Sequence, residues 1–259
     1  MKRFLKIVLL STLLLLLVAV GGFVLWAETP ARPGVAALKA LESDEFVYVF
    51  EHENHIVFYP AICEAKLTAE NATGQPHTIT AFIFYPGGRV DYRAYAPALR
   101  KIAEQGIIVF LLRVRLNLAF FDIEAGAPVL TSTEGVDLWA VGGHSLGGVA
   151  ASIFAPNHPQ VRGVVFWASY PTDEQLKTIG LPVLSIYGTL DGLARPEEIE
   201  QSRALLPETA VFLPIEGGNH AQFGDYGFQN GDNPASIPAE TQWEQIAQAT
   251  AQFLLSLTR

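Results

Sequence analysis

The sequence predicts an α/β fold: a doubly wound, mostly parallel sheet with helices on both faces. Two observations predict it. From residue 45 onward, short apolar runs of strand type alternate with stretches of helical periodicity, which is the pattern of strand–helix units in a parallel sheet. One of these runs, residues 107–112, is continuously apolar (IIVFLL), as expected of a strand buried on both faces. Because ligands bind such sheets at the carboxyl ends of the strands, the residues that follow each strand are the functional candidates.

The N-terminal segment, residues 1–27, is a separate unit. Basic residues in the first six positions precede an apolar run over residues 7–27, long enough to cross a hydrocarbon core of about 30 Å as a helix. The basic end is expected to stay in the cytoplasm and the remainder to be exported. We predict an uncleaved transmembrane anchor. The alternative is a signal segment, cut after Ala19-Val20-Gly21 to release a secreted form.

Residues 28–44, which contain two prolines and Gly34, predict a linker, so the globular domain covers 45–259. A chain of 259 residues with 50% hydrophobic content can bury one large core. The net charge of -9 at pH 7 argues against a nucleic-acid partner, because phosphate backbones bind basic surfaces. The single cysteine, Cys63, excludes a disulfide within the chain.

The elements of the domain follow in order. The predicted strands are 46–50, 56–59, 79–85, 107–112, 138–141, 161–167, 183–187 and 210–214. The predicted helices are 95–105, 118–133, 149–155, 196–206 and 241–257, of which 118–133 is the weakest because a glycine and a proline interrupt it. The first two strands are expected to form an antiparallel pair. The segment between residues 167 and 181 is too short for a helical cap, so we expect no cap domain and an open site.

The motif G-x-S-x-G occurs once in the chain, at Gly143, Ser145 and Gly147. It lies between a predicted strand and a predicted helix, which is the context of a nucleophile elbow. A serine on so sharp a turn requires neighbours with almost no side chain. The helix that begins behind it directs backbone N–H groups and a positive dipole end toward the reacting centre. Ser145 is therefore the predicted nucleophile.

A serine hydroxyl needs a base to take its proton and an acid to orient that base, in the chain order serine, acid, histidine. Asp191 follows the strand at 183–187, and His220 follows the strand at 210–214. The other histidines precede the serine, adjoin it or end its helix, so His220 is the predicted base. Asp191 is the predicted acid, with Asp173 as its rival and Asp225 and Asp232 as further candidates. The H-E-N-H run at 52–55 lacks the helical spacing of a zinc signature, and we predict no metal site.

The oxyanion of an acyl-transfer intermediate needs two N–H donors. One is expected from Leu146, the residue after the nucleophile, and the other from the loop after the strand at 79–85. Gly88 is the favoured donor there, because glycine lets the backbone approach a substrate closely; Arg89 is the alternative. The predicted substrate-binding residues also follow strand ends, with core or loop packing as their alternative role: Arg89, Asn117, Phe121, Tyr170 and Phe223.

Four segments resemble the α/β-hydrolase superfamily, and within it the lid-less bacterial serine hydrolases related to dienelactone hydrolases. They are Tyr85-Pro-Gly-Gly88, Gly143-His-Ser-Leu-Gly-Gly148, Tyr187-Gly-Thr-Leu-Asp191 and Gly217-Gly-Asn-His-Ala-Gln-Phe-Gly224. The resemblance extends from about residue 46 to the C-terminus and implies the same nucleophile, acid and base. Two departures stand out. A serine replaces the cysteine nucleophile of dienelactone hydrolases, and the oxyanion loop has Pro-Gly-Gly where many relatives have His-Gly.

We therefore expect a membrane-tethered serine hydrolase that needs no cofactor and cleaves small carboxylic esters. The same triad would also serve a thioesterase, a lipid hydrolase or an acyltransferase. The alternative of another class is an exported binding module that kept the fold without turnover. The sequence predicts neither the acyl chain length of the ester nor the oligomeric state.

Overall fold

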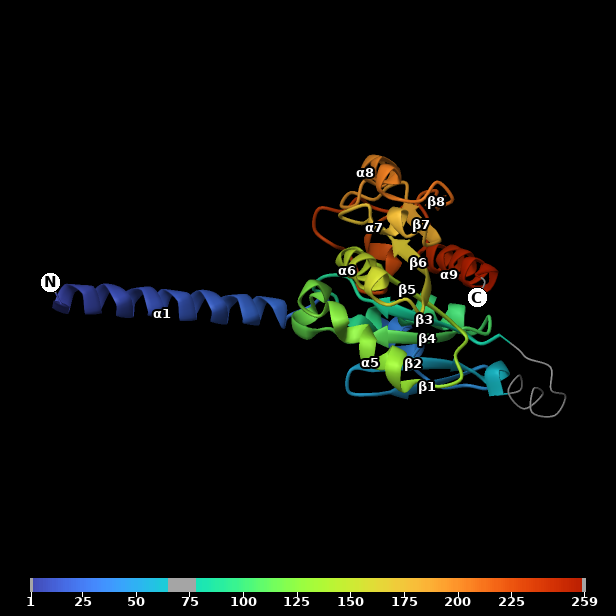
Figure 1. The fold of residues 1–259 in the computed structure, drawn as a ribbon, viewed down its shortest axis with the longest axis horizontal. Coiled ribbons are helices and arrows are strands. Elements are labelled where there is room, and N and C mark those ends of the chain that lie inside the picture. Colours follow the sequence, from blue (N-terminus) through green and yellow to red (C-terminus); the bar gives the residue numbers. More distant parts are fainter. Residues whose placement is uncertain (1, 65–77, 258–259) are drawn as a thin grey trace.

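The computed structural model describes residues 2–64 and 78–257. Within them, eight strands form one sheet in the order β1-β2-β4-β3-β5-β6-β7-β8 (Figure 1). Strand β2 pairs antiparallel with β1 and β4, and all other neighbours are parallel. The strands are β1 Val47–Glu51, β2 His55–Pro60, β3 Thr80–Tyr85, β4 Ile108–Leu112, β5 Leu138–His144, β6 Val161–Trp167, β7 Val183–Gly188 and β8 Val211–Ile215. The predicted fold class, with its antiparallel opening pair, is confirmed.

Helices cover both faces of the sheet. The α-helices are α1 Lys2–Ala27, α2 Val35–Lys39, α4 Ala96–Ala103, α5 Ala127–Ser132, α6 Leu146–Phe154, α7 Gln175–Thr178, α8 Pro196–Gln201 and α9 Ala239–Ser256. The 3-10 helices are η1 Tyr92–Tyr95, η2 Arg115–Asn117, η3 Ala119–Phe121, η4 Ile123–Gly126, η5 Ala155–Asn157, η6 Ser202–Leu205 and η7 Ala221–Phe223. The connection from β6 to β7 contains only the short α7, so the described chain has no cap domain.

The core has two layers because successive side chains of a strand point to opposite faces. In β3, Phe82 and Phe84 belong to the core that includes α4 and α9. Ile83 and Tyr85 belong to the core that includes α5 and α6. Burial on both sides explains why the central strands are apolar at every position rather than at alternate ones.

The helix predicted over residues 118–133 is instead a series of short turns, η3 and η4, followed by α5. Pro128 lies in the first turn of α5. Proline is accepted there because the first N–H groups of a helix have no intrahelical acceptor, but it cannot continue a helix from before. The consequence is a loop close to the carboxyl end of β4, with η3 packed against α6.

Helix α1 projects away from the domain, at the side of the sheet where β4 ends (Figure 1). Its segment Phe4–Ala27 has 24 residues, a mean hydropathy of 2.8 and no buried share. In the described part of the chain it is the one helix long and apolar enough to cross a membrane, properties that a signal sequence shares.

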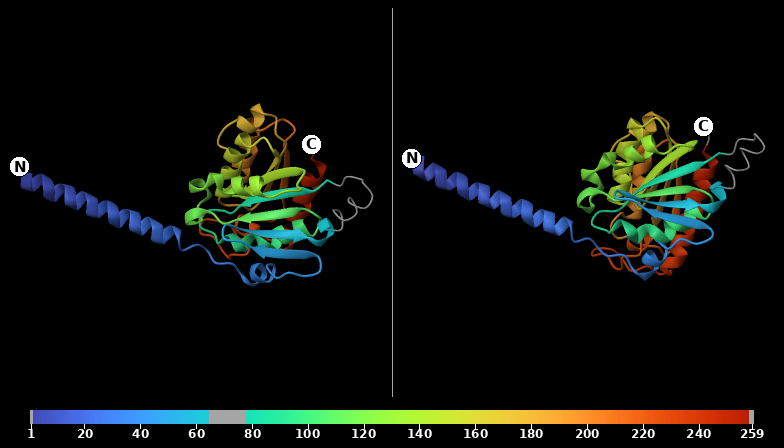
Figure 2. Two further views of the ribbon diagram at one scale, coloured as in Figure 1. Left: turned by 60° about the horizontal axis from the view of Figure 1, so that its bottom comes forward. Right: turned by 90° about the horizontal axis from the view of Figure 1, so that it is seen from below.

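The segment predicted as a linker, residues 28–44, is packed against the domain (Figure 2). Ala31 forms a parallel bridge with Val90. The N–H groups of Gly34 and Ala37 donate to the carbonyl and the carboxylate of Asp225, at 2.6 and 2.8 Å. These bonds satisfy backbone groups that a free linker would leave to water, so the segment is an ordered lead-in to β1.

Candidate active site

Ser145 occupies the turn between β5 and α6 with φ 51° and ψ -121°. A positive φ is costly for a residue with a side chain and persists only where the surroundings impose it. Here they do so through close backbone contacts. A Cβ on Gly143 would lie 2.4 Å from the carbonyl carbon of Gly147, and a Cβ on Gly147 would lie 2.2 Å from the carbonyl oxygen of Tyr85. Only glycine fits at both positions, so the motif spacing follows from sterics.

Gly147→Ala is expected to destabilise the protein by about 1–3 kcal/mol, because the new methyl group must displace backbone rather than a side chain. The melting temperature should fall by several degrees, and the loop after β3 should shift. Thermal unfolding of the full-length protein in detergent measures this effect. Gly22→Ala is the matched control, since its Cβ would meet nothing within 4 Å. An unchanged melting temperature in Gly147→Ala would contradict the close contact with Tyr85.

Asp191 and His220 lie in the turns after β7 and β8, and the fold brings them into contact. His220 Nδ1 lies 2.8 Å from Asp191 Oδ2, and the two residues are 1% and 2% exposed. The second carboxylate oxygen, Oδ1, accepts N–H bonds from Leu193 and Ala194 at 2.8 and 2.7 Å. A carboxylate can only accept, so Nδ1 of the imidazole is the donor and Nε2 carries the lone pair. Nε2 is buried and has no hydrogen-bond partner among the described residues.

His220 and Ser145 line one cavity of about 290 Å³. Its other walls are of mixed polarity and come from α6, the segment after β6, the turn after Asp191 and the loop before α9: Val149, Ala168, Ser169, Tyr170, Leu193, Ala194 and Gln229. Ser169 Oγ donates to the carbonyl of Ser145 at 2.7 Å and so helps to hold the turn. The cavity therefore has both Ser145 and the His220 imidazole in its lining.

The rival acids lie elsewhere. Asp173 is exposed and accepts the N–H of Gln175, and Asp225 binds the lead-in segment. Asp232 has a supporting role that the sequence did not reveal. One of its oxygens accepts the N–H of Gly192 at 3.0 Å and the other that of Ala221 at 2.8 Å, so it ties together the turns that carry Asp191 and His220.

The loop after β3 has three N–H groups that could face a substrate. Gly87 donates to the hydroxyl of Tyr95 at 3.0 Å, and Arg89 donates to the carbonyl of Asn117 at 2.7 Å. Within the described residues, the N–H of Gly88 has no acceptor. A Cβ on Gly88 would lie 3.7 Å from Cβ of Leu146, which is the first residue of α6 and has no intrahelical acceptor for its own N–H. Arg89 is thus the weaker candidate for an oxyanion donor, because its N–H is already bonded.

His144, the residue before the serine, lies behind His220. The two rings are 4.4 Å apart between centroids, and His144 stacks on Phe223 at 5.3 Å. His144 Nδ1 lies 2.9 Å from the hydroxyl of Tyr95, the same hydroxyl that accepts the Gly87 N–H. Tyr95 therefore joins the loop after β3 to the wall behind His220. Burial holds the pKa of His144 well below its ordinary value, so this ring is neutral.

A neutral buried histidine makes stability depend on pH. Below about pH 6.5 the unfolded chain binds a proton at His144 that the native state does not bind, so the free energy of unfolding rises with pH and levels off above that value. His144→Asn should remove up to about 1.4 kcal/mol per pH unit of that slope. Urea unfolding between pH 5 and 8 measures it. A slope equal to that of the parent would show that His144 takes up its proton in the native state.

The structure brings only one of the five predicted substrate-binding residues to the cavity, Tyr170. Phe223 is fully buried between His144 and Trp167, where it supports the wall behind His220 and is closed to a substrate. Core packing is the alternative role that the sequence left open, because position after a strand end does not tell inward from outward side chains.

The remaining three residues contact the end of α1. Arg89 Nε donates to the carbonyl of Trp26 at 3.0 Å, and its guanidinium lies over the Trp26 ring at 4.2 Å. Asn117 Nδ2 donates to the carbonyl of Ala27 at 3.1 Å. Phe121 packs edge-on against Phe23, with 5.9 Å between ring centroids. Arg89 and Asn117 thus donate to carbonyls of the last turn of α1, which have no intrahelical partner. None of the three side chains lines the cavity at Ser145.

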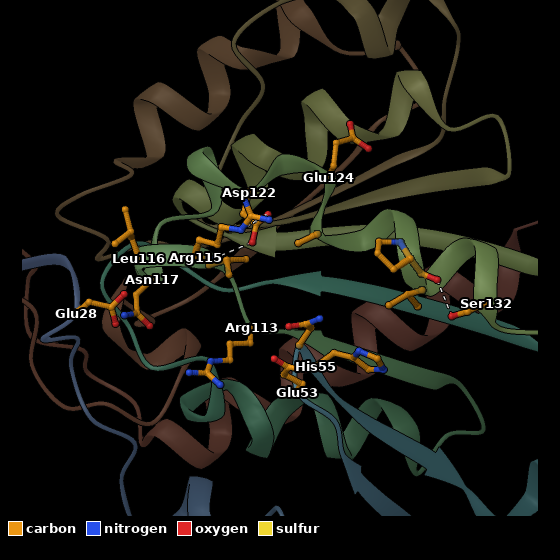
Figure 3. A pocket seen from close by; sticks show the side chains of 15 residues that line it. Glu28, Glu53, His55, Arg113, Arg115, Leu116, Asn117, Asp122, Glu124 and Ser132 are labelled. Carbon is orange, nitrogen blue, oxygen red and sulfur yellow. Dashed lines mark hydrogen bonds and ion pairs between the residues drawn. The ribbon is translucent and has the colours of Figure 1, made fainter. Parts of the chain in front are cut away.

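A second cavity has a volume of about 540 Å³ (Figure 3). It lies between the start of β2, the end of β4, the turns η2 to η4 and the residue after α1. Charged side chains of both signs line it, including Glu53, Arg113, Arg115 and Asp122. The hydroxyl of Ser132 in its wall donates to the carbonyl of Pro128 at 2.7 Å. No member of the predicted triad lines this cavity, so it is separate from the candidate active site.

The model of the family described as "Alpha/beta hydrolase family" matches residues 81–244, the part of the chain that contains Ser145, Asp191 and His220. No curated protein matches the sequence. Similar solved structures include Est1E from Butyrivibrio proteoclasticus, with 11% identity and a TM-score of 0.54 over 82% of this chain and 100% of that one. An esterase domain from a Rhodothermus marinus protein has 14% identity and a TM-score of 0.57 over 82% and 98% of the two chains. TT1662 from Thermus thermophilus has 14% identity and a TM-score of 0.56 over 81% and 97%. At these identities the likeness concerns the fold.

Proposed function

The chain belongs to the alpha/beta hydrolase family, and from that premise we propose that it is a serine hydrolase that cleaves carboxylic esters through an acyl-enzyme on Ser145. One observation carries the proposal. The buried His220–Asp191 pair, 2.8 Å apart, leaves Nε2 unbonded in a cavity that Ser145 also lines. This is the arrangement that a hydroxyl nucleophile requires of its base and its orienting acid.

In the proposed reaction, His220 Nε2 takes the proton of Ser145 as Oγ attacks the ester carbonyl. Asp191 keeps the Nδ1 proton in place and stabilises the imidazolium that forms. His220 then gives the proton to the departing alcohol, and a water molecule repeats the sequence to release the acid. The two N–H bonds that Asp191 accepts from Leu193 and Ala194 fix the carboxylate, so the imidazole needs no reorganisation during the reaction.

The developing oxyanion would be bound by the N–H groups of Gly88 and Leu146. Neither N–H group has an acceptor in the part of the chain that the structure describes, and the two residues adjoin, as the 3.7 Å from a Cβ at Gly88 to Leu146 Cβ indicates. The N-terminus of α6 adds its positive dipole end at the same point. Removing one such donor typically costs about 2.7–4 kcal/mol of transition-state stabilisation.

Two of the structural neighbours favour ester chemistry over other hydrolytic reactions. One is an esterase domain, and Est1E has been observed with ferulic acid bound. The cavity walls fit this chemistry, since Tyr170 and small apolar residues surround Ser145. We also propose that residues 1–27 anchor the protein in a membrane and that the domain at 45–259 lies on the exported side. Cleavage to a secreted form is the alternative.

The test is a hydrolysis screen with full-length protein in detergent, using p-nitrophenyl esters of increasing acyl length. We expect turnover that peaks at one chain length, together with covalent labelling of Ser145 by a fluorophosphonate, located by peptide mass spectrometry. Absence of both turnover and labelling would overturn the proposal and favour a binding module with this fold.

A further inference from the structure

The end of helix α1 lies beside the candidate active site rather than at a remote point of the domain. Arg89, whose guanidinium binds the carbonyl of Trp26, is the residue after Gly88, and Gly88 adjoins Leu146. Only the loop after β3 therefore separates the end of α1 from the turn that carries Ser145. The carboxyl ends of the parallel strands, where the site lies, are on the side of the domain from which α1 departs (Figures 1 and 2).

Four aromatic residues at this place form one exposed surface, which we call the aromatic rim: Phe23 and Trp26 of α1, and Phe120 and Phe121 of η3. Phe23 contacts both Trp26 and Phe121, and Phe121 contacts Phe120, with 5.8–6.1 Å between ring centroids. Phe120 and Phe121 remain 59% and 53% exposed. The turn η3 that carries them packs against α6, the helix that begins after Ser145. The same helix therefore contacts the rim and positions Ser145.

The length of α1 places the rim at the membrane surface. Its 24-residue segment Phe4–Ala27 spans about 36 Å as a helix, against about 30 Å of hydrocarbon. The last turn of α1 then lies at the level of the lipid headgroups, where tryptophan and arginine side chains are favoured. Phe120 and Phe121, in contact with that turn, lie at the same level. The one apolar surface that would cover them without a further partner is the bilayer that holds α1.

The cavity at Ser145 holds only part of a large ester. Its volume of about 290 Å³ is at the lower limit for sites that enclose a drug-sized molecule. Beside Ser145, Leu146 is 39% exposed, and Leu118 and Leu146 both lie within 4 Å of a Cβ on Gly88. Leu118 directly precedes η3, which carries Phe120 and Phe121 of the aromatic rim. A long-chain ester would place one arm in the cavity and the other across Leu146 toward the bilayer.

From these observations we propose that the anchor holds the active-site edge against the membrane, and that the substrate is a long-chain lipid ester resident in that bilayer. This inference rests on the proposed function. Ser145 Oγ bonds to the acyl carbon, the ester C–O bond breaks, and the lipid alcohol leaves with the proton from His220. Water then cleaves the acyl-enzyme and yields the fatty acid and free Ser145. The fatty acid and the alcohol return to the same membrane.

The test compares two esters with full-length protein in phosphatidylcholine vesicles: 4-methylumbelliferyl palmitate in the bilayer and 4-methylumbelliferyl butyrate in water. The measured quantity is the ratio of the two rates for each variant. Phe120→Ser should lower this ratio about five- to tenfold, because a large ring leaves the interface. The matched control is Phe228→Ser, a similar exposed ring (70%) outside the rim, and it should leave the ratio as in the parent.

A second variant tests the role of the anchor geometry. Inserting ten glycine and serine residues between Glu28 and Thr29, together with Arg89→Ala and Asn117→Ala to remove the side-chain bonds to Trp26 and Ala27, keeps the protein on the membrane but frees the domain from the end of α1, so the ratio should again fall severalfold. A ratio unchanged by both changes, with butyrate still cleaved, would overturn the inference and leave the proposed function intact. Failure to cleave butyrate, with no labelling of Ser145, would overturn both.

Discussion

Ser145→Ala is expected to lower kcat/KM for a soluble ester by about 10⁴–10⁶-fold, the loss that follows when a triad nucleophile is removed from a hydrolase. The reason is chemical rather than structural. Alanine keeps the Cβ and the positive φ of Ser145, so the elbow, the His220–Asp191 pair and the two N–H donors stay in place. What remains is the modest acceleration from the oxyanion donors acting on a water molecule.

The measurement uses p-nitrophenyl butyrate and full-length protein in detergent. Ser152→Ala is the matched control, because Ser152 lies on the same helix, is buried, and donates only to the carbonyl of Val149 in its own helix. Its activity should equal that of the parent. A Ser145→Ala variant that kept a tenth or more of the parent activity would exclude Ser145 as the nucleophile.

Asp191→Asn should lower kcat about 10⁴-fold with little loss of stability. The asparagine oxygen can keep the two N–H bonds that Oδ1 of Asp191 accepts from Leu193 and Ala194. Its amide nitrogen would then face Nδ1 of His220, and two donors cannot bond. The imidazole must accept at Nδ1 and carry its proton on Nε2, the tautomer that cannot take a proton from Ser145.

Asp173→Asn is the matched control for the acid. Asp173 is the rival that follows the preceding strand, but it is exposed and bonds only locally to Gln175, so its replacement should leave kcat unchanged. The reverse outcome, in which Asp173→Asn is inactive and Asp191→Asn retains activity, would move the acid to the end of β6. Thermal unfolding of both variants separates a chemical loss from a folding defect.

The strands and the candidate residues at their ends could be predicted because they depend on local pattern. Strand β4 is apolar at every position, which marks burial on both faces. Asp191 and His220 each follow a parallel strand, β7 and β8, and the carboxyl ends of parallel strands lie at the same end of a sheet. Their contact is therefore a consequence of topology, although both residues are distant from Ser145 in the sequence.

What the sequence could not predict is the contacts of a side chain where several segments meet. Phe223 follows a strand as Tyr170 does, yet it is buried behind His220. The choice between Gly88 and Arg89 depends on a carbonyl from Asn117, a residue of another loop. The contact of His144 with Tyr95 and His220 has no sequence signal, since a histidine inside a G-x-S-x-G motif shows no periodicity. Each of these outcomes is set by tertiary packing.

The contacts at the end of α1 also decide where a soluble version of this protein can begin. Hydropathy alone places the boundary at Glu28, but a chain that starts there lacks the carbonyls of Trp26 and Ala27 that accept from Arg89 and Asn117. Both side chains lie on loops that contact Gly88, so such a truncation alters the neighbourhood of the oxyanion donors. Starting ahead of Phe23 retains the last helical turn. In this protein the final turn of the apolar helix packs as part of the folded domain. The start of a soluble version therefore belongs within the hydrophobic segment rather than after it.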